Sequence, residues 1–356
     1  MANRERARYA FVLVSRPGQA FVRHSLVEAV RQLRAEVWAA LPDEAALGSM
    51  PLELDPKASE LSAGSRPQVV LLDREGRRYL FKLAPPDHIA AELLAYRVRR
   101  TLRCLHVPTA RRKFKLPELG EREGLVQPMI AHEEGRLPAD PRDWSAVAAE
   151  HLLREHPWEW LLANLDTHVD QYLLVGPHKL PVNIDWDHTL LDLAIDKLDR
   201  FNMRSATVAP VRNLFYSEYV AGRVRSDFYG MLLEARRIET RISDRRLTRL
   251  VRQYCDELAL PADRRQELCD RMVLRKRGLP AAFDAFVADI ELERRESLGM
   301  VPSRRTTAAQ VTSRVQDAWQ RLAITVLHDN VVRPSLKAYR VVLGVGERIF
   351  GRPTGE

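Results

Sequence analysis

Hydrophobic and polar residues follow two different patterns along the chain. Apolar residues at helical spacing predict a helix over residues 25–41, after a short strand over residues 9–14. From residue 52 to residue 129 the pattern changes to short apolar runs separated by turn residues. Two of these runs, 69–72 and 79–83, flank a charged segment with one glycine, which is typical of a β-hairpin turn.

A helix and two further strands complete this first region. Pro85, Pro86 and Asp87 form a stop followed by a helix-start signal, so we predict a helix over residues 88–102. Strands are predicted after it, near residues 110–116 and 124–130.

Beyond residue 141 the pattern is helical, with one exception. Residues 172–175 and 181–184 are strand formers on either side of a turn at Gly176 and Pro177, which predicts a β-ribbon inside a helical region. The sequence therefore predicts an α+β fold with a small β-rich lobe and a large, mostly helical lobe.

Length and composition fit such a two-lobed protein. The chain has 356 residues, of which 46% are hydrophobic, so it can bury a sizeable core, and 29% are charged, so neither a disordered nor a collagen-like chain fits. We divide it into an N-terminal strand–helix extension, an N-lobe, a C-lobe and a C-terminal helical extension, over residues 1–48, 49–130, 131–295 and 296–356.

The sequence gives no sign of a membrane span or of a secretory signal. The apolar run near the N-terminus is short and is interrupted by Ser15 and Arg16, so we expect a cytoplasmic protein. The cysteines, Cys104, Cys255 and Cys269, are odd in number and lack a CxxC spacing. We expect reduced structural thiols.

Positive charge is concentrated in the second half of the chain. Residues 1–200 carry 28 basic and 29 acidic residues, whereas residues 201–356 carry 28 basic and 19 acidic residues. A basic face can attract nucleic acid, anionic lipid or an acidic protein, although solvated arginine-rich helices give the same count.

Two carboxylates near the predicted ribbon are the strongest candidates for chemistry. Asp166 lies in the loop before its first strand, and Asp185 lies at the end of its second strand. Because the ribbon returns on itself, the two can converge on one point. One carboxylate can then orient an attacking hydroxyl while the other holds a divalent metal.

Upstream residues add the parts of a nucleotide site. Lys82 ends an apolar strand, and Glu92 lies on the following helix, where it could point back at the sheet and pair with Lys82. Before the hairpin, the small residues of a loop let backbone N–H groups approach phosphate; these are Ser62, Gly64 and Ser65. Taken singly, each has a structural explanation, but their order is the one that kinase-type phosphoryl transfer requires.

At this point the sequence resembles the HipA-like kinases, which belong with the atypical kinases that include the phosphatidylinositol kinases. The segment Asn164-Leu-Asp166-Thr-His168-Val-Asp-Gln171 is similar to that family's catalytic loop, N-x-D-x-H-x-x-N, and Ile184-Asp185 looks like its metal-binding Asp. Weaker similarities are Gly64-Ser65-Arg66-Pro67-Gln68, placed like its phosphate loop, Phe81-Lys82, and Ala91-Glu92.

The resemblance implies a bilobal protein-kinase-like fold and a role for each matching residue. It implies ATP and Mg²⁺ as cofactors and a Ser/Thr hydroxyl, on a protein, as the acceptor. It assigns roles as follows: Asp166 as catalytic base, His168 as a group that orients Asp166 or its loop, Asp185 and Gln171 as metal ligands, Lys82 as phosphate clamp with Glu92 as its partner, and residues 126–129, with Gln127 and Met129, as the hinge against adenine. For His168, a buried histidine bonded to a backbone carbonyl is the alternative.

The sequence departs from the family pattern at two positions. Gln171 stands where the family has a metal-binding Asn, so either Gln171 reaches the ion in a different rotamer or Asp170 takes its place. Gln68 stands where the family has the phosphate-loop Lys. Both changes lower the expected activity, and Gln171→Asn is predicted to raise turnover. A pseudokinase that binds nucleotide as an interaction module is therefore an alternative.

Other functions remain open at the level of sequence. A metal-dependent hydrolase could use the acids and histidines of this region, which are Asp166, His168, Asp170, Asp185, Asp187 and His188. Within the kinase interpretation, an inositol-lipid or small-molecule acceptor is the alternative to a protein, and self-phosphorylation could fall on Ser62 or Ser65. The basic half could bind nucleic acid or an antitoxin-like partner. The apolar residues of 322–350 could lie on a membrane or pack on the helical lobe.

Overall fold

The computed structural model describes residues 17–57, 68–116, 119–130, 135–198 and 211–301. The chain divides into two compact units, residues 1–203 with 208–300 and residues 204–207 with 301–356, and every element described below belongs to the first. The strand predicted over residues 9–14, the small-residue loop with Ser62, Gly64 and Ser65, and the tail over 322–350 lie outside the described residues.

One five-stranded antiparallel sheet forms the smaller lobe, with strand order β1-β2-β3-β5-β4. Its strands are β1 (Glu53–Leu54), β2 (Gln68–Leu72), β3 (Arg78–Leu83), β4 (Ala110–Leu116) and β5 (Gly120–Pro128). The predicted hairpin is confirmed: β2 pairs with β3 from Gln68 opposite Lys82 to Leu72 opposite Arg78. The strands predicted near residues 110–116 and 124–130 are β4 and β5, which pair from Ala110 opposite Val126 to Leu116 opposite Gly120.

The two faces of the sheet have different partners, because side chains alternate along a strand. Tyr79, Phe81 and Val126 pack with Leu47 of the short helix α2 (Glu44–Ser49). The opposite face packs on α3 (Pro86–Arg100), where Leu125 of β5 contacts Ile89 and Leu93. Lys82 lies on this second face, opposite Leu125 in the β3–β5 register. The alternation therefore directs Lys82 toward α3.

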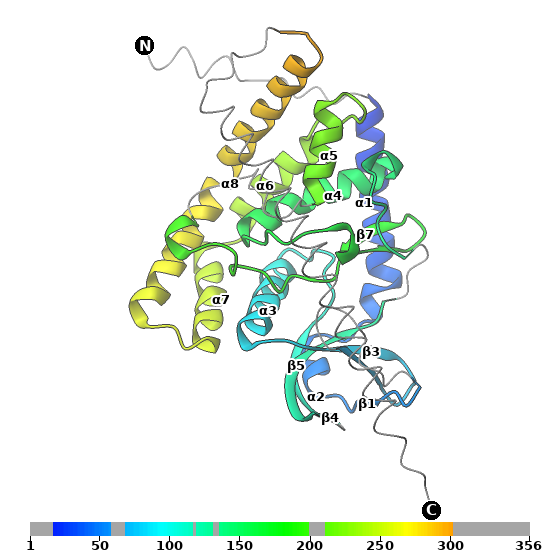
Figure 1. The fold of residues 1–356 in the computed structure, drawn as a ribbon, viewed down its shortest axis with the longest axis vertical. Helices are drawn as coiled ribbons and strands as arrows, with labels where there is room; N and C mark the ends of the chain where they lie inside the picture. Colours follow the sequence, from blue (N-terminus) through cyan, green and yellow to red (C-terminus); the bar gives the residue numbers. More distant parts are fainter. Residues whose placement is uncertain (1–16, 58–67, 117–118, 131–134, 199–210, 302–356) are drawn as a thin grey trace, which may run out of the picture. The chain divides into compact units, whose positions relative to one another are not determined.

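Helices and a β-ribbon make up the larger lobe. Its helices are α4 (Ala146–Leu161), α5 (Val211–Val220), α6 (Tyr229–Arg241), α7 (Asp244–Glu257) and α8 (Ala262–Ser297), and its ribbon is β6 (Tyr172–Val175) with β7 (Leu180–Asn183). In Figure 1 the sheet occupies the lower part of the view and α4, α5 and α6 the upper part, with α3 between them. The ribbon confirms the exception to the helical pattern.

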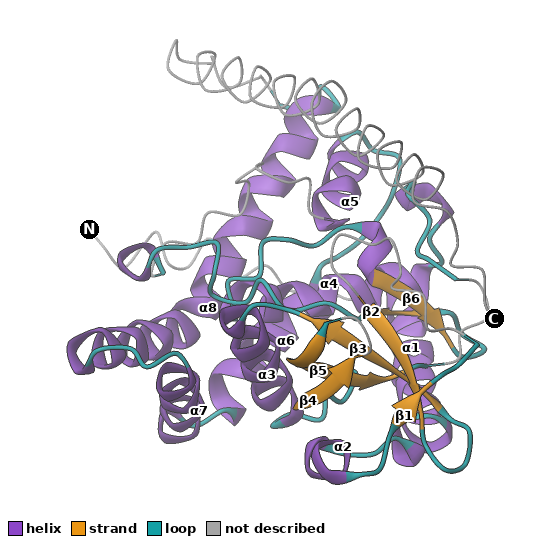
Figure 2. Cartoon of the chain, turned by 60° about the horizontal axis from the view of Figure 1, so that its bottom comes forward, coloured by secondary structure: helices purple, strands orange, loops and turns teal. Residues whose placement is uncertain are grey.

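The helix predicted over residues 25–41 is α1 (Pro17–Glu36), followed by a short 3₁₀ turn over Trp38–Ala40. It covers the back of the ribbon: Leu26 and Leu33 pack with Val175 and Val182. Figure 2 shows β6 next to α1. The N-terminal extension therefore supports the ribbon that connects the two candidate carboxylates.

The α+β fold with a small β-rich lobe and a large, mostly helical lobe is confirmed. The boundaries proposed for the extensions and lobes stay a prediction. All three cysteines are free thiols, as expected. In the part of the chain that the structure describes, no helix is both long and apolar enough to cross a bilayer.

Candidate active site

Lys82 connects the sheet to the ribbon. Its Nζ donates to the carbonyl of Ile184 at 2.8 Å and lies 3.8 Å from Asp185 Oδ1. The Lys82 side chain is only 11% exposed, whereas that of Asp185 is 36% exposed. Because a buried charge needs polar partners, this lysine at the end of an apolar strand is held by a carbonyl and a carboxylate of the other lobe.

Glu92 is the buried anion behind Lys82. Its Oε1 accepts from Gln127 Nε2 at 3.1 Å, and its Oε2 accepts from the Trp186 backbone N–H at 2.6 Å. Burial alone would raise the pKa of Glu92, but the hydrogen bond from His106, the charge of Lys82 and the Trp186 N–H outweigh it and lower the pKa. The direct ion pair predicted between Glu92 and Lys82 is therefore corrected: Glu92 acts on Lys82 through its charge, and Lys82 pairs with Asp185.

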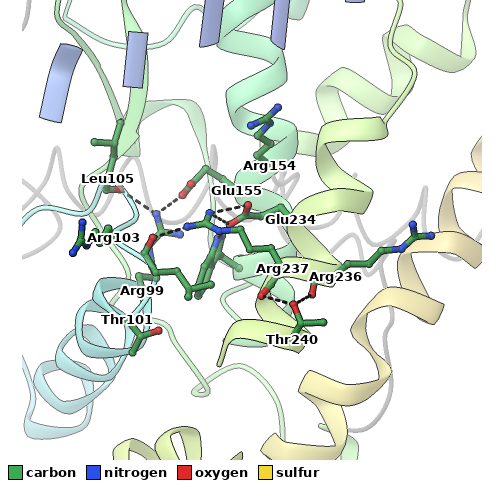
Figure 3. Close-up of polar contacts among 12 residues, drawn as sticks. Arg99, Thr101, Arg103, Leu105, Arg154, Glu155, Glu234, Arg236, Arg237 and Thr240 are labelled. Carbon is green, nitrogen blue, oxygen red and sulfur yellow. Dashed lines mark hydrogen bonds and ion pairs between the residues drawn. The ribbon is translucent and has the colours of Figure 1, made fainter. Parts of the chain in front are cut away.

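A chain of buried polar groups fixes Glu92 from behind. His106 Nε2 lies 3.6 Å from Glu92 Oε1, and His106 Nδ1 accepts from Arg99 Nε at 3.0 Å. Burial lowers the pKa of His106 to about 4, so the ring is neutral near pH 7 and carries its proton on Nε2, facing Glu92. Arg99 is itself held by Glu155 and by the carbonyl of Leu105, as Figure 3 shows.

The loop that carries Asp166 begins where α4 ends. Ala163 takes a left-handed conformation, with a φ of 49°, and the next N–H, of Asn164, donates to the carbonyl of Glu159 at 2.9 Å. Beneath the loop, the Glu159 carboxylate binds Arg212, and Arg212 Nη1 donates to Thr167 Oγ1 at 3.3 Å. A buried ion pair thus holds the loop just beyond Asp166.

The two carboxylate loops are tied to each other by backbone hydrogen bonds. Ile184 N–H donates to the carbonyl of Gln171 at 2.9 Å, and Leu190 N–H donates to the carbonyl of Leu162 at 3.0 Å. At the tip, Asp185 N–H donates to Asn183 Oδ1 at 2.8 Å. These bonds fix the loop of Asp185 against the loop of Asp166, as the return of the ribbon predicts.

The contacts of Gln171, His168 and His188 near Asp166 differ from those predicted. The Gln171 amide lies within the loop: Nε2 donates to Asp166 Oδ2 at 3.5 Å, and Oε1 accepts from His168 N–H at 3.4 Å. The His168 side chain is 44% exposed and faces Asp170 at 3.9 Å, which contradicts the buried alternative. His188 is the histidine beside Asp166, with 3.5 Å between Nε2 and Oδ2.

The predicted hinge residues have different surroundings. The Gln127 side chain is buried and bonded to Glu92, whereas Met129 is exposed. Gln68, which leads out of the small-residue loop, starts β2 directly opposite Lys82. Strand β2 therefore begins beside the lysine.

The sequence assigns no role to three residues that the structure brings to this region, His88, Arg99 and His106, and it indicates His188 only as a possible metal ligand. His106 and Arg99 are polar residues at buried positions. The available signal for Arg99 is its place among the apolar residues of α3. His88 gave no signal, because a polar residue in a first helical turn is ordinary.

Comparisons with known proteins give distant structural neighbours. No protein-family model matches the sequence. No curated protein matches it either. Among solved structures, the chain is similar to a proinflammatory kinase of Helicobacter pylori, CtkA, at 13% identity over 67% of this chain and 97% of that one, with a TM-score of 0.44.

Two further similar structures are a golgi casein kinase and an aminoglycoside phosphotransferase from Alicyclobacillus acidocaldarius. The casein kinase is 12% identical over 68% of this chain and 76% of that one, with a TM-score of 0.39. The phosphotransferase is 11% identical over 68% and 94%, with a TM-score of 0.29. All three TM-scores are below 0.5, so these structures are distant neighbours that carry no information about the function of the site.

Proposed function

We propose that the protein is an ATP- and Mg²⁺-dependent phosphotransferase that moves the γ-phosphate to a Ser or Thr hydroxyl of a protein. The observation that carries the proposal is the meeting of Lys82 with the loop of Asp185, 3.8 Å between Nζ and Oδ1, while that loop is bonded to the loop of Asp166. One cation and two acids from three separate segments thereby share one region, which is the constellation that phosphoryl transfer uses.

The donor set fits Mg²⁺. Asp166 and Asp185 offer carboxylate oxygens, which are the ligands that this ion prefers, and both side chains are partly exposed. Asp185 would hold the ion. Gln171 Oε1 would supply a further oxygen ligand once its hydrogen bond from the His168 N–H is broken. When bound, the ion would neutralise charge on the transferring phosphate.

The side chains would then divide the work. The Lys82 ammonium would bind phosphate oxygens of the nucleotide, with the buried Glu92 carboxylate behind it as a compensating negative charge. Asp166 would accept the proton of the acceptor hydroxyl. In the same step the hydroxyl oxygen would bond to the γ-phosphorus, and the bond between that phosphorus and the bridging oxygen of ADP would break.

The choice of a protein Ser/Thr acceptor rests on the resemblance of residues 164–171 to the HipA-like catalytic loop. The chain itself offers hydroxyls at Ser62 and Ser65, which precede β2 in the sequence, and these are our candidates for self-phosphorylation.

The test is transfer of label from γ-labelled ATP. Wild type with Mg²⁺ is expected to label itself or an added protein on Ser or Thr, and Asp185→Asn is expected to lose the transfer. Asp196→Asn is a matched control, because Asp196 is exposed and has no place in the proposed site. Equal labelling by wild type and Asp185→Asn would contradict the proposal, and nucleotide binding without any transfer would favour the pseudokinase.

A further inference from the structure

Two histidines and an aspartate converge where the first turn of α3 meets the segment after β7. The ligand atoms of His88, Asp187 and His188 all lie within 4.8 Å of one another. His88 Nδ1 is 3.4 Å from one Asp187 oxygen, and His188 Nε2 is 4.0 Å from the other. The two rings meet edge to face, with 5.1 Å between their centroids.

His188 is oriented by a carboxylate on its far side. His188 Nδ1 lies 3.1 Å from Asp192 Oδ1. Because a carboxylate accepts, Nδ1 donates to Asp192, and in the neutral ring this leaves Nε2, on the side of Asp187, as the atom that can bind a metal. A carboxylate that orients a histidine in this way is the usual outer support of a metal-binding imidazole.

Burial and access also suit a bound ion. The Asp187 side chain is 8% exposed and lies between the two partly exposed imidazoles. The partly exposed imidazoles leave the cluster open to solvent.

We propose that His88, Asp187 and His188 bind a divalent transition-metal ion of the zinc class, at a site separate from the Mg²⁺ site proposed at Asp185. Two imidazoles and one carboxylate, with the remaining position open, are ligands for such an ion, whereas Mg²⁺ prefers oxygen. In a tetrahedral zinc site the ligand atoms lie about 3.3 Å apart. The closest contact here, 3.4 Å, already has that spacing, and the wider ones need side-chain closure.

The site adjoins the carboxylate proposed as base, because His188 Nε2 is also 3.5 Å from Asp166 Oδ2. The metal proposal nevertheless does not depend on phosphotransfer. It is therefore tested by a signal from the metal itself, in protein without nucleotide.

The experiment is titration of the metal-stripped full chain with Co²⁺, whose visible absorption reports tetrahedral nitrogen and oxygen ligands, followed by displacement with Zn²⁺. Wild type should bind one Co²⁺ with such a band and lose it on adding Zn²⁺. His88→Ala and His188→Ala should abolish the band, and Asp192→Asn should weaken binding about 10- to 100-fold. His178→Ala, at an exposed histidine in the β6–β7 turn, is the matched control and should bind normally, as should Asp185→Asn.

Thermal unfolding without metal shows which variants are folded, and Asp192→Asn keeps the test decisive if a histidine variant is not. Absence of Co²⁺ binding by wild type overturns the proposal. So does binding that survives in folded His88→Ala and His188→Ala, or that is lost in Asp185→Asn while both histidine variants retain it. Loss of phosphotransfer in any variant leaves these results unaffected.

Discussion

Lys82 is the side chain on which the phosphotransfer proposal depends most. Its ammonium contacts Ile184 and Asp185 across the two lobes. We expect Lys82→Ala to weaken binding of ATP with Mg²⁺ by at least about tenfold, because it removes a charged hydrogen-bond donor. Calorimetric titration measures the change. Lys113→Ala, at an exposed lysine of β4, is the control, and equal affinity of both variants would show that Lys82 is structural.

Gln171 gives a second prediction at this scale. Its amide nitrogen donates to Asp166 Oδ2, so one oxygen of the proposed base is occupied. Gln171→Asn, which shortens the side chain by one methylene, is expected to free that oxygen and to raise turnover severalfold. The rate of label transfer at saturating ATP measures this effect, and a large loss would mean that Gln171 is needed to position Asp166.

At the scale of single residues, the sequence predicted the positions of the acids and the lysine, but not the side chains that contact them. Lys82 and Asp185 follow from strand alternation and from the return of a ribbon, which are local properties. The partners of Glu92 come from β5 and from the segments after α3 and β7, so only the folded chain brings them together. Which of His168 and His188 faces Asp166 depends on the direction of each loop side chain. The spacing of residues along the sequence does not determine that direction.

Helix α4 carries two buried neutral histidines. Burial lowers the pKa of His151 to about 3, with Arg99 and Arg154 adding to it, and lowers that of His156 well below its usual value. Between these values and the ordinary 6.5, the unfolded chain binds more protons than the folded chain. Stability contributed by these residues is therefore present above about pH 6.5 and is lost as the pH falls.

We expect His151→Gln to lose less stability than wild type on acidification, by about 2 kcal/mol between about pH 7 and about pH 5. Urea unfolding at the two pH values measures the difference. Glu155, whose pKa burial raises to about 7, acts in the opposite direction, but it is present in both proteins and cancels. Identical pH slopes would mean that His151 is protonated in the folded state.

Strand β5 passes very close to β3 at Gly124. A Cβ there would lie 2.4 Å from the Lys82 carbonyl and 2.8 Å from the Phe81 ring. Gly124→Ala should therefore lower the free energy of unfolding by about 1–3 kcal/mol, through a forced backbone shift. Gly48→Ala is the control, since its Cβ would meet nothing within 4 Å. Denaturant unfolding of both variants is the measurement, and equal stability would refute the close approach.

Elements with a strong local pattern were predictable, and those defined by packing were not. The hairpin β2–β3 and the ribbon β6–β7 are bounded by turn residues, so their registers follow from the sequence. Helix α2 has only six residues, too few for a periodic pattern to show. Helix α1 packs on the ribbon because their apolar faces meet. The hydrophobic pattern of one helix does not specify the element against which that helix packs.

At the scale of the whole molecule, the two-lobed fold brings together residues distant in the sequence. Lys82 and Ile184 are joined by a hydrogen bond across 102 positions, and Glu92 and Trp186 by another across 94 positions. Both bonds link α3 and the sheet to the segment after the ribbon. Binding of nucleic acid or of an antitoxin-like protein to the basic second half stays a prediction.

Nucleotide binding is expected to depend on Lys82 and Asp185, and proton transfer on Asp166. The most direct measurement determines ATP affinity and the rate of label transfer on the same preparation of Asp166→Asn with Mg²⁺. We predict wild-type affinity together with transfer slowed by at least about 100-fold. Transfer at the wild-type rate would contradict the account.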